Sequence, residues 1–223
     1  MKIGISMRIV TAQDYFETRD AISHDWIDLA NRLNASIVLI PNKLEEISEL
    51  ISNLDLMVLS GGEDISDRFT GIADFPTSAI NEKEFRDIQE IKIIDICIEK
   101  KIPILGVCRG MQVINLYFGG KLRKIDEAKH VAVNHKIDYV KSAAIDTSDL
   151  PKTVNSFHKL GISPVDLGQD LFPFAHSGDG LIEALKHKDI GVWGVMWHPE
   201  RYFEGTFSGE DLFHKIVVQS RRT

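Results

Sequence analysis

The segment that decides the fold is Ile104-Leu-Gly-Val-Cys-Arg-Gly-Met-Gln112. Apolar and small residues lead into Cys108, a glycine stands two residues away on each side, and a helical pattern follows. This arrangement predicts a buried strand, a turn too tight for bulky neighbours, and a helix that begins directly after the thiol. The helix N-terminus favours a thiolate, and the free N–H groups of the turn can receive an oxyanion. The pattern indicates a nucleophile, and a buried structural cysteine is the alternative that it leaves open.

The chain up to residue 120 alternates apolar runs with helical periodicity. Strands are predicted at 2–6, 36–40, 56–59 and 102–107, and helices at 22–33, 44–54, 85–98 and 111–118. Residues 7–19 are polar and irregular, and 63–80 are expected to form a loop. Because continuous apolar strands are buried on both sides, we expect an α/β fold with a mostly parallel central sheet and helices on both faces.

After residue 120 the pattern of apolar and polar residues changes. Short β-like runs at 132–140, 153–157, 181–188 and 191–197 are separated by Pro, Gly, Asp and Ser. They predict a small antiparallel extension of the sheet, followed by a closing helix at about 209–219. No linker separates the two parts, so residues 1–223 are expected to form a single domain.

The composition argues against several classes of protein. The formal net charge is −7 and no basic stripe occurs, so nucleic acid is not an expected partner. Two cysteines do not make a disulfide framework, and no apolar stretch has the length of a membrane span, so a cytoplasmic location without a membrane partner is expected. No P-loop, dinucleotide fingerprint, H-E-x-x-H or paired C-x-x-C occurs, so the sequence predicts no cofactor and gives a metal site little support.

A thiolate nucleophile needs a base, and the base needs an orienting group. The segment Trp197-His-Pro-Glu200 offers both, because it follows an apolar run and Pro199 favours extended geometry. Residues two apart on an extended segment face the same way, so the carboxylate of Glu200 is expected beside the imidazole of His198. The alternative is a turn at a sheet edge with two solvated polar residues.

Taken together, 106–112 and 197–200 resemble the class I glutamine amidotransferase fold, which is flavodoxin-like, and more narrowly its γ-glutamyl hydrolase branch. Three further segments match this family and extend the resemblance over nearly the whole chain. They are Ser60-Gly-Gly62, Val154-Asn-Ser-Phe-His158 and Asp179-Gly-Leu-Ile-Glu-Ala184. Each match is moderate evidence, and all of them in this order form a specific signal.

The resemblance implies a role for each matched residue. Cys108 would be the nucleophile, His198 the general base and then acid, and Glu200 its orienting group. Backbone N–H groups of Gly62 and Arg109 would hold the oxyanion, and the Arg109 side chain has the alternative of a surface salt bridge. The residues that would bind the glutamyl end of the substrate are Gln112, Asn155, Ser156, Phe157 and His158.

The resemblance does not identify the group that is released from the γ-glutamyl substrate. The chain is either a free-standing hydrolase that releases glutamate and an amine or amidate, or a glutaminase subunit that passes ammonia to a synthetase partner. A third interpretation is a regulatory binding module with a dead site, and the intact set of Cys108, His198 and Glu200 argues against it. As a protein partner, either a synthetase or a second copy of the chain in a homodimer is left open.

The stretch from Met7 to Trp26 resembles members of bacterial surface-polysaccharide pathways. That likeness implies γ-glutamyl-CDP-amidate as the small-molecule substrate, with Arg8 and Arg19 meeting its phosphates as guanidinium forks do.

Overall fold

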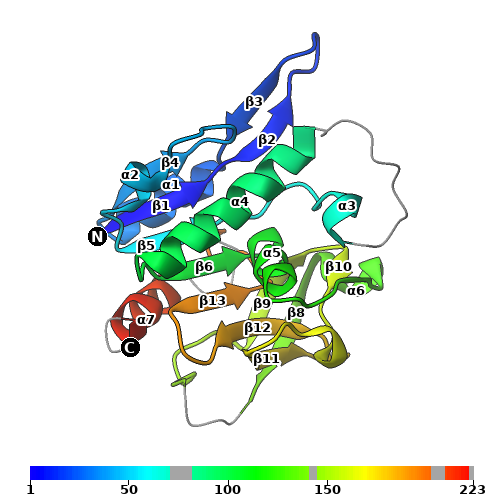
Figure 1. Cartoon of the computed structure of the whole chain (residues 1–223). Coiled ribbons are helices and arrows are strands. Elements are labelled where there is room, and N and C mark those ends of the chain that lie inside the picture. The colour runs from blue at the N-terminus through cyan, green and yellow to red at the C-terminus, as the bar shows by residue number, and fades with distance from the viewer. Residues whose placement is uncertain (71–81, 141–144, 202–208, 221–223) are drawn as a thin grey trace.

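The computed structural model describes residues 1–70, 82–140, 145–201 and 209–220, and a nine-stranded sheet runs through these residues (Figure 1). Five strands form its parallel part, in the spatial order β4 (Ser36–Ile40), β1 (Lys2–Ser6), β5 (Leu56–Leu59), β6 (Ile104–Val107) and β13 (Val192–Val195). Four antiparallel strands continue it: β12 (Ile182–His187), β11 (Leu171–Ser177), β8 (Val131–Tyr139) and β9 (Thr153–Phe157). The predicted α/β fold is confirmed.

Helices cover both faces of the sheet. Side chains of α1 (His24–Arg32) and α7 (Glu210–Ser220) share one apolar core, and those of α2 (Ser48–Ile51), α4 (Glu82–Glu99) and α5 (Arg109–Tyr117) share the other. Strand β5 shows why both are needed: Leu56 and Val58 enter the first core, whereas Met57 and Leu59 enter the second. Among the described helices, none combines the length and the apolar character that crossing a bilayer requires.

Short elements complete the described chain. They are the hairpin β2 (Arg8–Thr11) and β3 (Thr18–Ala21), helix α3 (Asp67–Thr70), helix α6 (Glu127–His130), the pair β7 (Arg123–Lys124) and β10 (Leu160–Gly161), and a 3₁₀ turn at Pro164–Asp166. The hairpin extends away from the sheet (Figure 1). The expectation of irregular structure at 7–19 was wrong, because an exposed hairpin buries too little apolar surface to show the alternation that identifies a strand.

Three further expectations need correction. The helix predicted at 44–54 shrinks to the single turn α2, and α3 lies inside the predicted loop at 63–80, of which residues 71–80 lie outside the described residues. Strand β13 was assigned to the antiparallel extension, but it pairs in parallel with β6. Strand β11 was missed because Pro173 interrupts its pattern, and its ladder with β12 is irregular just after that residue.

Candidate active site

Cys108 occupies the junction of β6 and α5, with backbone angles of φ 51° and ψ −103° that L-residues rarely adopt. The two flanking glycines permit this junction. A Cβ on Gly106 would lie 2.5 Å from the backbone of Gly110, and a Cβ on Gly110 would overlap the carbonyl of Leu59. The predicted strand, tight turn and helix are confirmed. The thiol therefore lies at the first turn of α5, where backbone N–H groups have no partner within the helix.

The register of the sheet brings His198 to the same edge as Cys108. Strand β13 runs beside β6 with Val195 opposite Val107, so the chain that leaves β13 passes the elbow. Nδ1 of His198 lies 2.7 Å from Oε1 of Glu200, and each of the two residues is only 3% exposed. The alternative of a solvated polar turn is therefore wrong.

The three side chains also interact through their charges. Burial alone would lower the pKa of His198, but the negative charges of Glu200 and Cys108, with a hydrogen bond to each, outweigh it and raise this pKa to about 9. His198 is therefore an imidazolium at neutral pH. An imidazolium in contact with a sulfur and a carboxylate can protonate a departing group and then act as a base.

The backbone of His198 is held by Asn155 on β9. Nδ2 of Asn155 donates to the carbonyl of His198 at 3.0 Å, and the N–H of His198 donates to Oδ1 of Asn155 at 2.8 Å. Phe157 lies edge-to-face against the imidazole, with ring centroids 5.7 Å apart, and the guanidinium of Arg201 lies 4.6 Å from its ring centroid. The predicted residues Asn155 and Phe157 thus both contact His198.

The loop 60–62 also approaches the imidazole, and Arg86 holds its backbone. A Cβ on Gly61 would lie 2.6 Å from Cε1 of His198, so only glycine allows this contact. Nη2 of Arg86 donates to the carbonyls of Ser60 and Gly61 at 2.7 and 3.1 Å. Gly62 has a φ of +148°, which also favours glycine. The loop is therefore fixed against the site by a side chain from α4.

Arg86 belongs to a buried ionic network that we call the arginine cluster: Arg86, Asp87, Glu90 and Arg109. Nε of Arg86 donates to Glu90 at 3.0 Å, and the guanidinium of Arg109 pairs with both Glu90 and Asp87. Burial raises the pKa of Glu90, but Arg109 and Arg86 outweigh it and lower this pKa. The Arg109 residue is 2% exposed, so the alternative of a surface salt bridge is wrong.

Sequence reasoning missed the arginine cluster. Its signal was present in the predicted helix 85–98, where Arg86 and Glu90 stand four residues apart at positions that helical geometry places on one face. A charged pair within an amphipathic helix is usually solvated. Only the packing of α4 on α5 shows that this pair is buried beneath the loop 60–62.

The remaining predicted glutamyl contacts are engaged with backbone groups of the described chain. Nε2 of Gln112 donates to the carbonyl of Leu160 at 3.0 Å, and Oγ of Ser156 donates to that of His130 at 2.7 Å. The ring of His158 also binds the carbonyl of Leu160, at 3.0 Å, and its other nitrogen faces a second cluster. Their contact with substrate stays a prediction.

The two predicted phosphate-binding arginines lie in different places. Arg8 borders a small pocket together with Gly61, His198 and Glu200, and the structure gives its buried Nε no hydrogen-bond partner among the described residues. Arg19 lies farther along the hairpin, where Nε donates to Glu17 at 2.7 Å. The structure therefore brings Arg8, but not Arg19, to the pocket that contains His198.

Comparison with known proteins places this geometry in a family. The model of the peptidase C26 family matches residues 3–200. The chain is 34% identical to the γ-glutamyl-CDP-amidate hydrolase of Campylobacter jejuni over 90% of each chain. It is also 34% identical to the glutamine amidotransferase-like protein YvdE of Lactococcus lactis over 84% of each.

A solved structure shows the same fold. The crystal structure of a protein described as a GMP synthase subunit from Thermoplasma acidophilum matches with a TM-score of 0.71, over 100% of this chain and 94% of that one, at 24% identity. The family model covers most of the chain, and two relatives exceed 30% identity over most of their lengths. The chain therefore belongs to the peptidase C26 family.

Proposed function

We propose that this protein hydrolyses a γ-glutamyl amide bond through a γ-glutamyl thioester on Cys108. The observation that carries the proposal is the contact of His198 with both Cys108 and Glu200, at the carboxyl edge of the parallel sheet. Membership of the peptidase C26 family and the 34% identity to a γ-glutamyl-CDP-amidate hydrolase support it.

In the first half of the reaction, the Cys108 thiolate attacks the γ-carbonyl carbon and the carbonyl electrons move to oxygen. The His198 imidazolium gives its proton to the amide nitrogen as the C–N bond breaks, and the amine or amidate leaves. In the second half, the now neutral His198 takes a proton from water, which attacks the thioester. The C–S bond breaks, and glutamate and the thiolate are released. Glu200 keeps the imidazole oriented through both steps.

The oxyanion is assigned to the backbone N–H groups of Gly62 and Arg109. Arg109 opens α5, so its N–H has no partner within the helix. In a trans peptide the C=O and the following N–H point in opposite directions. Since the carbonyl of Gly61 accepts from Arg86, the N–H of Gly62 points away from that guanidinium. Each such donor contributes roughly 3 kcal/mol of barrier lowering in comparable sites.

For the substrate we propose γ-glutamyl-CDP-amidate, split in the cytoplasm to glutamate and cytidine diphosphoramidate for capsular polysaccharide synthesis. The name of the Campylobacter jejuni relative supports this choice. So does Arg8, whose buried and unpaired Nε, among the described residues, borders the same pocket as His198. Arg19 is kept as a second, more distant phosphate contact.

The test is glutamate release from γ-glutamyl-CDP-amidate, γ-glutamyl-GABA and glutamine, each incubated separately with purified protein. A high rate on the first amide without any partner is expected. A rate on glutamine that rises sharply with an added synthetase would instead identify a glutaminase subunit. Cys108→Ala should abolish release while the fold is kept. Cys97→Ala is the matched control, because burial raises the pKa of Cys97 to about 12 and removes it from chemistry.

The phosphate role of Arg8 has its own test. Arg8→Ala should lower kcat/KM on γ-glutamyl-CDP-amidate about 10- to 100-fold, the value of a charged hydrogen bond, and leave γ-glutamyl-GABA nearly unchanged. Arg19→Ala is the comparison variant and should have the smaller effect. Equal losses on both substrates would remove the phosphate role.

A further inference from the structure

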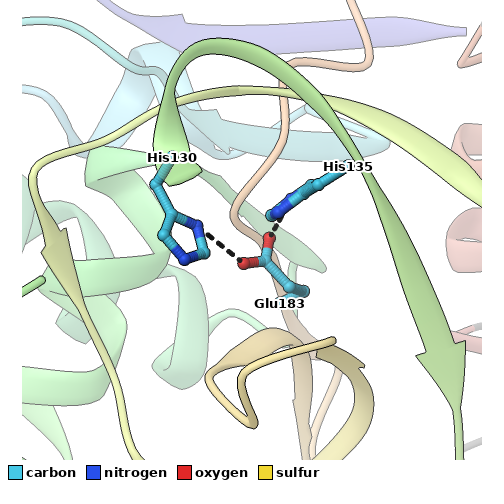
Figure 2. A group of neighbouring side chains, drawn as sticks. All are labelled: His130, His135 and Glu183. Atoms are coloured by element: carbon cyan, nitrogen blue, oxygen red, sulfur yellow. Dashed lines mark ion pairs between the residues drawn. The ribbon is translucent and has the colours of Figure 1, made fainter. Parts of the chain in front are cut away.

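A second group of buried polar side chains lies on the antiparallel part of the sheet. Figure 2 shows His130 and His135 pointing at the carboxylate of Glu183. Nδ1 of His130 lies 3.8 Å from Oε1 of Glu183, Nε2 of His135 lies 3.5 Å from Oε2, and Nε2 of His158 lies 3.6 Å from Oε1. We call these four residues the histidine cluster.

The atoms that face one another in this cluster lack hydrogen bonds. Within the described ranges, Nδ1 of His130, Nε2 of His135, Nε2 of His158 and both carboxylate oxygens of Glu183 are shielded from solvent and unpartnered. Glu183 is 0% exposed. Buried polar atoms in proteins are almost always paired, so five unpaired atoms directed at one another indicate a missing positive charge between them.

In two of the imidazole rings, the nitrogen that points away from Glu183 already has a hydrogen-bond partner. Nε2 of His130 lies 3.1 Å from the carboxylate of Asp179, which also accepts from Ser177 at 2.6 Å. Nδ1 of His158 lies 3.0 Å from the carbonyl of Leu160. Both partners are acceptors, so these ring nitrogens carry protons, and in a neutral ring the nitrogen that faces Glu183 then presents a lone pair. A histidine that donates its outer N–H to a carboxylate or carbonyl is the usual arrangement around a bound metal ion.

We propose that the histidine cluster binds a divalent transition metal ion, zinc by its ligand chemistry. His130, His135 and Glu183 each offer one ligand atom, and these three atoms lie within 4.8 Å of one another. Zinc bonds of about 2.0–2.1 Å place tetrahedral ligands roughly 3.3 Å apart, so ligand atoms that lie within 4.8 Å of one another would move closer together when the ion binds. His158 faces the same carboxylate, with Nε2 3.6 Å from Oε1, but it is not one of these three ligands.

The surroundings provide a route for the ion and a role for it. His130, His135 and Asp179 line an open cleft of about 520 Å³, through which a hydrated ion reaches the ligands. The ligands come from the end of α6, from β8 and from β12, whereas β11 separates β8 from β12 in the sheet. The three ligands come from separate elements, so the ion ties these elements together, and the fourth tetrahedral position is left for water.

The sequence alone gave this site little support because its ligands are scattered. Zinc motifs are recognised by short, fixed spacings between ligands. Here the ligands stand at 130, 135 and 183, and only the folded sheet brings them to one point. The proposal does not depend on the hydrolase activity, and its test uses no turnover.

The experiment measures metal content in full-length protein that carries Cys108→Ser, so that the candidate catalytic thiolate cannot bind the ion. The protein is purified without a histidine tag, stripped with EDTA, reloaded with Zn²⁺ or Co²⁺ and dialysed. About one zinc ion per chain is expected, with a melting temperature several degrees above that of the stripped protein. His135→Ala and Glu183→Gln should abolish both effects. His214→Ala, an exposed histidine on α7, is the matched control and should keep both.

X-ray absorption of the zinc-loaded protein tests the ligands without any substitution in the cluster. Imidazole scattering with nitrogen and oxygen neighbours at about 2.0–2.1 Å and no sulfur is expected. The proposal is overturned by far less than one ion per chain, by a sulfur neighbour, or by binding that persists in both cluster variants.

Discussion

The arginine cluster and the histidine cluster bury charge in two different ways. In the arginine cluster, the carboxylates of Asp87 and Glu90 are both paired with guanidinium groups of the same chain. In the histidine cluster, neither carboxylate oxygen of Glu183 has a hydrogen-bond partner in the part of the chain that the structure describes. Both lie in the interior, yet only in the first are the carboxylates paired with cationic side chains at hydrogen-bond distance, and there the buried Nε of Arg109 is the atom left without a partner among the described residues.

The chemistry of the basic group explains the difference. Arginine is a cation at every physiological pH, so it neutralises a buried carboxylate by itself. A neutral imidazole presents a lone pair, which attracts a metal ion and repels a carboxylate oxygen. The arginine cluster therefore holds the loop 60–62 without a bound ion, whereas the histidine cluster is expected to take up a metal ion from solution.

The largest expected effect comes from Glu90→Gln, which leaves two buried guanidinium groups with one carboxylate fewer. Breaking a buried pair in this way costs about 3–5 kcal/mol of unfolding free energy, with or without EDTA. Urea unfolding measures it. Glu99→Gln, at an exposed position of the same helix, is the control and should change stability little. A loss below about 1 kcal/mol would mean that the arginine cluster does not depend on this carboxylate.

Next in size is Arg86→Lys, which keeps the charge but loses the fork that holds the carbonyls of Ser60 and Gly61. If this loop supplies an oxyanion donor, kcat should fall about 100-fold while KM changes little. A fall of this size is expected when one oxyanion donor is out of place. Steady-state kinetics measure the fall in kcat, and a thermal melt shows whether the variant is still folded. Arg68→Lys, whose side chain is 55% exposed, should keep full activity. An unchanged kcat would show that Arg86 is not a positioning residue.

His198 differs from the imidazoles of the histidine cluster, because Glu200 and Cys108 give it the negative charge that stabilises its proton. Its pKa of about 9 lies above the ordinary value, so the imidazolium persists at lower pH and is lost as pH rises through this value. The rate of γ-glutamyl amide hydrolysis should therefore fall about tenfold per pH unit above this pKa, which gives the pH profile an alkaline limb. Glu200→Gln should move the limb to lower pH. An alkaline limb that is the same in both proteins would contradict the assignment.

The smallest expected effect comes from the same substitution in the histidine cluster, and it is the counterpart of Glu90→Gln. Glu183→Gln in EDTA should change the unfolding free energy by less than about 1 kcal/mol, because the new amide N–H donates to a ring lone pair. Urea unfolding with and without Zn²⁺ measures it, and only the native protein should gain stability from zinc. A loss as large as that of Glu90→Gln would show that Glu183 is neutralised by imidazolium protons instead.

Local patterns predicted much of the fold and part of the site. The apolar runs at 2–6, 36–40 and 56–59 and the elbow at Cys108 were found because burial and tight turns restrict residue choice directly. Strand β11 was missed because Pro173 breaks its pattern. The hairpin at 8–21 was missed because no residue of its two strands is fully buried, so they lack the apolar alternation of a half-buried strand.

The sequence by itself determined that a cysteine stands at a strand-to-helix elbow and that a histidine and a glutamate stand two residues apart on an extended segment, because both features rest on neighbours in the chain. Only the tertiary structure decided that Arg86 holds the loop 60–62 and that His130, His135 and His158 converge on Glu183. Those contacts join residues up to fifty-three positions apart, as the spacing of 130 and 183 shows. Side chains that distant meet through strand order and register, which local periodicity does not encode.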